Sequence, residues 1–245
     1  MEISVIASGS NGNSCLVEHK STSILIDAGK SCREIEARME KMGKFLENVD
    51  ALIITHAHSD HVRGVGAISR KHNIPVYLTK ETFSRARHLL GEFERKTFKH
   101  NNSFMIINTL IRPIKTSHSV DSCGFVMGKF GLFTDTGIVT KEIQVAALKL
   151  DTILLESNYD IDMLLNGSYP VYLKQQVLSN HGHLSNIHAS HLVEKTKNLQ
   201  TVLLGHLSGN NNTKSLAEKT FETLVKRKMD FQVCSREKES GTWEV

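Results

Sequence analysis

Residues 51–61, ALIITHAHSDH, constrain this chain more than any other part of its sequence. They begin as a short apolar run with β-branched residues, which is typical of a buried strand. The run ends at four potential metal ligands within six positions, His56, His58, Asp60 and His61. Crowded imidazoles are costly unless a metal ion or an acid organises them. The sequence therefore predicts a strand that delivers a metal site.

The spacing of these ligands predicts two ions. A loop leaving a strand end turns His56 and His58 to one side, while Asp60 and His61, at the start of a following helix, face the other. In two-metal sites the ions lie roughly 3.5 to 4 Å apart.

The pattern His56-x-His58-x-Asp60-His61 resembles the metallo-β-lactamase-fold superfamily of metal-dependent hydrolases. That resemblance implies three further ligands, each at the end of a strand: a histidine, a bridging aspartate and a late histidine. His118, Asp135 and His206 each follow an apolar run in this order.

The order of expected elements fits the same family. Strands are expected at 2–7, 15–18, 23–29 and 74–78, helices at 32–42, 62–72 and 81–90, and consecutive strands from about 97 to 135. This order matches an α/β fold (α+β in some schemes), a four-layer αββα sandwich with its active site at one edge of the two sheets. Asp27 ends the 23–29 strand and is expected to orient a ligand histidine.

Composition favours one domain over residues 1–245, because no linker or shift in composition divides the chain, although 245 residues also suffice for two small domains. The start shows no signal peptide and no segment has the length of a membrane span, so we expect a cytoplasmic protein that does not bind membranes. The four cysteines lack CxxC spacing and are expected to be buried free thiols.

Two segments are candidate substrate contacts. The loop 8–14 offers backbone N–H groups and polar side chains that suit a phosphate, so Ser8, Ser10, Asn11 and Asn13 are predicted to bind substrate, although a hairpin turn alone would explain the loop. Residues 80–100 carry a surplus of Lys and Arg. These residues could contact phosphates, and a solvated helix face explains the surplus equally well. The net charge of +4 is only mildly basic.

Late in the chain, Glu156 ends an apolar strand and His183 lies in Gly-His-Leu-Ser. This order resembles the phosphodiesterase branch of the superfamily, which includes tRNA 3′-processing endonucleases and the cyclic phosphodiesterase of phosphonate breakdown. The resemblance implies that His183 is a general acid oriented by Glu156. His181, His188 and His191 are expected to be structural, and the remaining candidates without ligand-like neighbours are expected at the surface: His72, His88 and His100.

Motifs at seven places, including the 8–14 loop and the Gly205-His206-Leu207-Ser208 segment, look very like the bacterial YycJ group, also called WalJ or VicX. The match spans nearly the whole chain. The resemblance implies a cytoplasmic two-metal nuclease that degrades double-stranded DNA from 5′ ends. It also implies a link to DNA repair and, through the operon, to cell-wall regulation in Gram-positive bacteria. Ser208 joins the predicted substrate contacts.

The resemblance also implies roles for the ligands. One ion is assigned to His56, His58 and His118, the other to Asp60, His61 and His206, and Asp135 bridges them. This donor set suits two Zn²⁺ or Mn²⁺ ions better than magnesium or calcium. A metal-bridged hydroxide is expected as nucleophile, with Asp60 counted among the catalytic residues beside His183 and Glu156.

Three alternatives stay open. A lactamase or a glyoxalase of the same fold fits less well, because a secreted lactamase would carry a signal peptide and a glyoxalase a further domain, whereas only about forty residues follow His206. The ligand set leaves a thioesterase open. An RNase, or a small-molecule cyclic phosphodiesterase, shares the ligand set. A non-catalytic regulator would be favoured by a lost ligand, and none of the seven is missing. Protein partners are not indicated.

Overall fold

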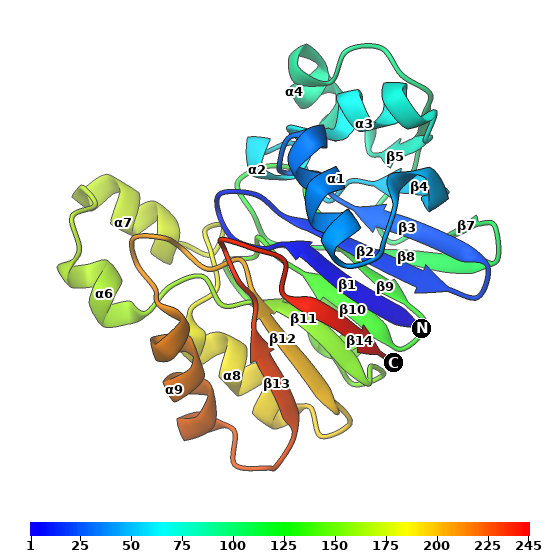
Figure 1. Cartoon of the computed structure of the whole chain (residues 1–245). Helices are drawn as coiled ribbons and strands as arrows, with labels where there is room; N and C mark the ends of the chain where they lie inside the picture. Colours follow the sequence, from blue (N-terminus) through cyan, green and yellow to red (C-terminus); the bar gives the residue numbers. More distant parts are fainter. The chain divides into compact units, whose positions relative to one another are not determined.

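The computed structural model describes residues 1–245 and divides into two compact units, each a β-sheet with helices packed on it (Figure 1). The first unit comprises Met1–Pro113, Val120–Cys123 and Ser235–Val245, and the second Ile114–Ser119 and Gly124–Cys234. The strands are β1 (Glu2–Ala7), β2 (Ser14–His19), β3 (Thr22–Ile26), β4 (Ala51–Ile53), β5 (Val76–Leu78), β6 (Arg95–Thr97), β7 (Phe104–Ile106), β8 (Thr109–Lys115), β9 (Cys123–Met127), β10 (Phe130–Phe133), β11 (Thr152–Glu156), β12 (Thr201–Gly205), β13 (Asp230–Val233) and β14 (Gly241–Glu244). The helices are α1 (Cys32–Lys41), the short 3₁₀ helix η1 (Leu46–Asn48), α2 (Ser59–Val62), α3 (Val65–His72), α4 (Lys80–Leu90), α5 (Lys141–Ala147), α6 (Ile161–Asn166), α7 (Val171–Leu178), α8 (Asn186–Lys195) and α9 (Lys214–Leu224).

The sheet of the first unit has the order β14-β1-β2-β3-β4-β5-β6. Strands β14, β1, β2 and β3 pair antiparallel, and β3 to β6 pair parallel. Strand β1 therefore runs in the same direction as β3 and β4. Because the carboxyl ends of parallel strands meet at one edge of a sheet, the loops after β1, β3 and β4 lie together there.

Helices cover one face of this sheet through a single apolar cluster (Figure 1). Ile35 and Met39 are one helical turn apart on α1, Val65 and Ile68 face the same cluster from α3, and Leu90 does so from α4. This spacing is the amphipathic pattern expected of helices that pack on a sheet.

The prediction of one continuous helix over 62–72 is wrong, because α2 ends at Val62 and α3 begins at Val65, after Gly64. The Gly64 N–H donates to the Ala28 carbonyl at 2.7 Å instead of continuing α2. A Cβ at this position would lie 2.3 Å from the Lys30 carbonyl oxygen, so the chain crosses here too closely for any side chain.

In the second unit, β9 to β13 are adjacent in the order β13-β12-β11-β10-β9. Strands β10, β11, β12 and β13 are parallel, and β9 is antiparallel to β10. Helices α5, α8 and α9 pack on them through an apolar cluster that includes Ala146, Leu192 and Phe221. Asp135, Glu156 and His206 therefore stand at or just beyond the carboxyl ends of three adjacent strands.

Several expectations for single residues are corrected. His72 and His100 are not surface residues: their side chains are 6% and 17% exposed, and they contact Glu36 at 2.8 Å and Asp121 at 2.7 Å. His88 is exposed, as predicted.

The cysteines are free thiols, three of them buried, but Cys32 is only partly buried. It lies near Glu36 and His72, where Lys71 contacts the Glu36 carboxylate at 2.6 Å. None of the helices has the length and apolar character needed to cross a membrane. A single domain over 1–245 stays a prediction.

Candidate metal centre

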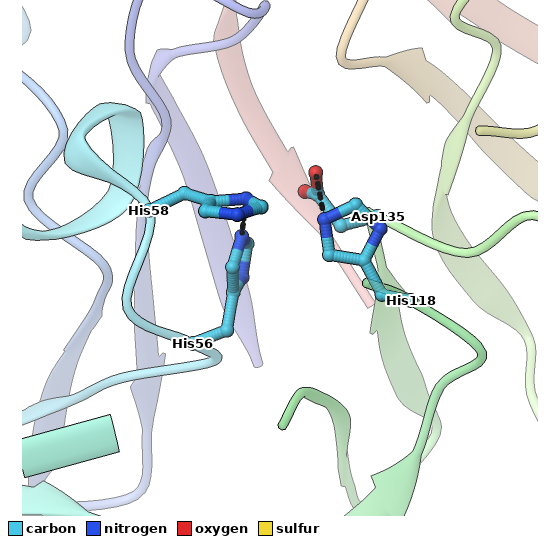
Figure 2. Close-up of side chains that lie close together, drawn as sticks. All are labelled: His56, His58, His118 and Asp135. Carbon is cyan, nitrogen blue, oxygen red and sulfur yellow. Dashed lines mark hydrogen bonds and ion pairs between the residues drawn. The ribbon is translucent and has the colours of Figure 1, made fainter. Parts of the chain in front are cut away.

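Four predicted ligands of the first unit lie together directly after β4. The His56 Nε2 and His58 Nδ1 atoms are 3.1 Å apart, with the two rings edge to face (Figure 2). Asp60 and His61 sit in the first turn of α2, where His61 Nε2 lies 3.5 Å from Asp60 Oδ2. The His56 and His61 ring centroids are 4.1 Å apart. Three imidazoles and a carboxylate thus converge from one short segment.

Asp27, just beyond the end of β3, contacts Thr55 and His61 and so supports the cluster of histidines after β4. Its Oδ1 accepts from the Thr55 N–H at 2.9 Å, and its Oδ2 accepts from the Thr55 hydroxyl at 2.8 Å and contacts His61 Nδ1 at 2.7 Å. The Thr55 hydroxyl also lies 3.0 Å from His56 Nδ1. The predicted contact between Asp27 and one of the predicted ligand histidines, His61, is confirmed.

Asn13 of the predicted substrate loop touches the same group. Its backbone N–H donates to the Asp60 carbonyl at 2.8 Å, and its side-chain amide lies 3.0 Å from His61 Nε2 and 3.4 Å from Asp60 Oδ2. Asn13 Oδ1 accepts from the Gly9 N–H at 3.0 Å. Asn13 therefore fastens the loop beside the predicted ligands. Ser8 is buried and Ser10 is exposed in this loop.

In the second unit, Asp135 presents its two carboxylate oxygens to two different histidines. Its Oδ1 lies 3.6 Å from His118 Nε2 (Figure 2), and its Oδ2 lies 3.5 Å from His206 Nε2. All three side chains are buried. One carboxylate between two imidazoles is the arrangement that a bridging ligand requires.

Glu156, fully buried at the end of β11, links three parts of the second unit. Its Oε1 contacts His183 Nδ1 at 2.7 Å and His206 Nδ1 at 2.8 Å, while its Oε2 accepts from the N–H groups of Thr136 and Leu184 at 2.8 and 3.2 Å. Asp135, Glu156, His183 and His206 each offer an atom within 4.8 Å of the others.

The charges of this buried group influence one another. Burial raises the pKa of Glu156, but His183 and His206 outweigh it, so the pKa lies below its usual value. Burial lowers the pKa of His183, but Glu156 and then Asp135 outweigh it and leave that pKa raised. Burial lowers the pKa of His118, whose Nδ1 contacts the Gly182 carbonyl at 3.1 Å.

The histidines share a feature that suits metal binding. In His56, His61, His118 and His206, Nδ1 contacts an oxygen from a side chain or the backbone. Such a contact fixes the tautomer and directs Nε2 to a metal ion. His58 differs, because its Nδ1 faces the neighbouring imidazole. Imidazole and carboxylate donors fit Zn²⁺ or Mn²⁺.

Three of the residues at strand ends have left-handed backbone conformations. Asp27, Asp135 and His206 have φ of 59°, 55° and 56°. Residues other than glycine rarely adopt this conformation, which concentrates at functional sites. All three residues lie where the chain leaves a strand of its sheet.

Sequence reasoning missed two contacts of this group. The contact of Glu156 with His206 was not predicted, although the two residues lie at the ends of adjacent parallel strands. Asn158 was not singled out, and its amide donates to the His206 carbonyl at 2.8 Å. Its place two residues beyond Glu156 was the signal available.

The remaining predicted residues have local roles in the structure. The Ser208 hydroxyl accepts from the Asn210 and Asn211 N–H groups at 3.4 and 3.2 Å. His181 is exposed and its Nδ1 lies 3.1 Å from the Ser117 hydroxyl. The His188 Nδ1 atom lies 2.9 Å from the Ser185 hydroxyl.

Known proteins similar to this chain belong to a family of metal-dependent hydrolases, in agreement with the cluster of histidines and carboxylates. Residues 7–145 match the metallo-beta-lactamase superfamily. The chain is 33% identical over 261 residues to the exodeoxyribonuclease WalJ of Streptococcus pneumoniae, covering 98% of this chain and 95% of that protein. It is 30% identical to the exodeoxyribonuclease YycJ of Bacillus anthracis, covering 93% and 90%.

Among solved structures, the metallo-beta-lactamase fold protein YhfI of Bacillus subtilis is similar over 100% of this chain and 98% of its own, with a TM-score of 0.79 and 18% identity. The fold class predicted from the sequence, the α/β metallo-β-lactamase fold, is thereby confirmed.

Proposed function

The chain belongs to the metallo-β-lactamase superfamily and, within it, to the group of WalJ and YycJ, and on this premise we propose that it is a two-metal exonuclease that degrades double-stranded DNA from 5′ ends. Membership makes it a metal-dependent hydrolase. The observation that carries the proposal is the Asp135 carboxylate, which faces His118 with one oxygen and His206 with the other.

The proposed ligands of one ion are His56, His58 and His118, and those of the other are Asp60, His61 and His206, with Asp135 shared. The Nδ1 contacts described above support this set. Divalent ions bound there supply a nucleophile at neutral pH and stabilise the negative charge that develops at phosphorus.

His183 is the proposed general acid for the leaving oxygen. Its Nδ1 contact with Glu156 at 2.7 Å would orient the ring and leave Nε2 as the atom that donates the proton. The carboxylate also favours the protonated form of the ring, which an acid requires. Glu156 contacts the ligand His206 as well, so it positions both residues.

DNA as substrate is supported by the names of the two relatives and by the basic segment of the first unit. Lys80, Arg85 and Arg87 on α4, and Arg95 and Lys96 on β6, are exposed. Exposed cations neutralise backbone phosphates without reading sequence. The proposal includes one domain over 1–245, action in the cytoplasm and a part in DNA repair.

The test is cleavage of end-labelled duplex DNA by protein stripped of metal and reloaded with Mn²⁺ or Zn²⁺, with single-stranded DNA and RNA in parallel. Stepwise release of mononucleotides from 5′ ends is expected. Asp135→Asn should abolish it, whereas Asp151→Asn, a partly exposed aspartate of the same unit paired with Lys129, should not. Turnover of a small phosphodiester or thioester without cleavage of any polymer would refute the proposal.

A further inference from the structure

Two cations from distant parts of the sequence flank the loop Ser8–Asn13. Arg236 Nη1 lies 3.4 Å from the Ser10 hydroxyl, and the Arg236 carbonyl accepts from the Asn11 amide at 3.3 Å. Lys30 packs against Gly12 on the same loop. We propose that this loop, with Arg236 and Lys30, binds a phosphate group of the nucleic acid next to the bond that is cleaved. The inference rests on the proposed function.

The glycines of the loop allow these cations to lie against its backbone. Gly9 has φ of 137°, and a Cβ there would lie 2.9 Å from Arg236 Cγ. Gly12 has φ of 150°, and a Cβ there would lie 2.7 Å from Lys30 Cδ. Both conformations are accessible essentially only to glycine. The loop is therefore shaped so that an Arg and a Lys side chain pack directly on it.

The donors on this loop match a phosphate. The planar Arg236 guanidinium lies beside the exposed Ser10 hydroxyl, so a planar cation and a hydroxyl, two groups that bind phosphate oxygens, lie within a small space. Lys30 adds an ammonium group whose nearest carboxylate, Glu34, is 3.7 Å away, whereas Glu34 contacts Arg38 at 2.9 Å. Glu34 is thus held by Arg38 more closely than by Lys30.

The position of the loop connects this group to the proposed metal ligands. Asn13 contacts His61 at 3.0 Å, and Ser10, which contacts Arg236, is three residues earlier. Three residues span at most about 11 Å. Successive nucleotides of one strand rise by about 3.4 Å, so a phosphate held by Ser10 and Arg236 belongs to a nucleotide close to the cleaved bond.

The phosphate has two chemical sources, a terminal 5′ monoester or an internal diester of the backbone. If Arg236 holds the terminal group, wild-type protein should prefer duplexes with a 5′-phosphate over those with a 5′-hydroxyl, and Arg236→Gln should lose that preference. If it holds a diester, both duplexes should be affected equally by the substitution. Either result supports the binding site and identifies its ligand.

Binding is measured by fluorescence anisotropy of a labelled duplex in EDTA, at several salt concentrations, and cleavage is measured with Mn²⁺. For Arg236→Gln we expect affinity to fall roughly ten- to hundredfold and the slope of log K against log salt to fall by about one. KM should rise with kcat nearly retained. Arg236→Lys should be intermediate, because it keeps the charge and loses the planar fork.

Lys238→Gln is the matched control, because Lys238 is exposed and lies two residues from Arg236. It should leave affinity and slope unchanged. Thermal unfolding of each variant separates a folding defect from a binding defect, and Lys30→Gln provides a second variant that should also weaken binding.

The inference is overturned if folded Arg236→Gln binds and cleaves duplex DNA like wild type, which would leave the proposed function intact. If wild-type protein cleaves no polymer, the proposed function fails. Calorimetric titration with inorganic pyrophosphate then tests whether the phosphate site exists. Pyrophosphate binding that Arg236→Gln loses would still support the phosphate site. Equal or absent binding by both proteins would overturn it.

Discussion

Replacing Asp27 by asparagine should lower the affinity of the protein for divalent metal ions, although Asp27 is not itself a proposed ligand. The asparagine oxygen can still accept from the Thr55 N–H, as Oδ1 does at 2.9 Å. Its amide nitrogen would stand where Oδ2 now contacts His61 Nδ1 at 2.7 Å. Two N–H groups would then face each other unless His61 moves its proton to Nε2, the atom assigned to the metal.

The size of the effect follows from this contact. Loss of such an outer partner costs about 10- to 100-fold in metal affinity, which corresponds to roughly 1.4 to 2.7 kcal/mol. The buried carboxylate also supports the metal-free fold, and loss of a hydrogen bond to a charged group costs about 1.5 to 3 kcal/mol. For a chain of this length, each kcal/mol lowers Tm by roughly 2 to 4 °C.

The assay is competition between metal-stripped protein and a fluorescent chelator for Zn²⁺ or Mn²⁺, with thermal unfolding measured with and without metal. Asp50→Asn is the matched control: its Oδ2 accepts from the Ser23 N–H at 2.8 Å in the same unit, and an asparagine oxygen can replace it. Metal affinity of Asp27→Asn within twofold of wild type would refute the assignment of Asp27 as the residue that orients His61.

Three further predictions follow from the geometry. His183→Ala should keep both ions, shown by elemental analysis, and lower kcat by about 10² to 10⁴. Gly29→Ala should lose metal and stability together in titration and thermal unfolding, because a Cβ there would lie 1.7 Å from the Asp60 carbonyl oxygen. Glu36→Gln should lower stability by about 0.2 to 1 kcal/mol at neutral pH. The Lys71 hydrogen bond lowers the pKa of Glu36, so this contribution is complete above its ordinary value of 4.5 and should vanish in urea unfolding as pH falls through the lowered pKa.

Each of these variants has a control in the chain. His181→Ala should leave kcat unchanged, because His181 is exposed. Gly43→Ala should cost only about 1 to 2 kcal/mol for its φ of 70°, since nothing lies within 4 Å of the added Cβ. Glu40→Gln, on the exposed side of α1, should show no such pH dependence. Loss of both ions in His183→Ala, normal metal content in Gly29→Ala, or a pH-independent loss in Glu36→Gln would each contradict the reasoning.

Features set by local sequence were predictable. The run at 51–61 predicted a strand that ends at a cluster of histidines and an aspartate, and the structure has both. Helix α1 begins and ends close to the predicted 32–42 because Ile35 and Met39 recur at helical spacing. The contact between Asp27 and His61 is predictable, because an acid at a strand end lies at the same sheet edge as the loops after neighbouring strands.

Features set by contacts between distant segments were not predictable. The break at Gly64 depends on its bond to the Ala28 carbonyl and on the close approach of the Lys30 carbonyl, and the burial of His72 depends on Glu36 of another helix. Arg236 lies 225 positions from Asn11, and nothing in its own neighbourhood marks it as a partner of that loop. The local sequence specifies each helix or strand, but contacts between distant segments form only when these elements pack together.

The pairing of β14 with β1 has a consequence for synthesis of the chain on the ribosome. The first unit includes Ser235–Val245, whereas the second ends at Cys234. As the chain emerges, the second unit therefore has all its residues while β1 still lacks a neighbour on one side. An unpaired strand edge readily joins other strands. The nascent protein thus passes through an interval, ended only when residues 235–245 follow, in which the edge of β1 is exposed to chaperones and to neighbouring chains.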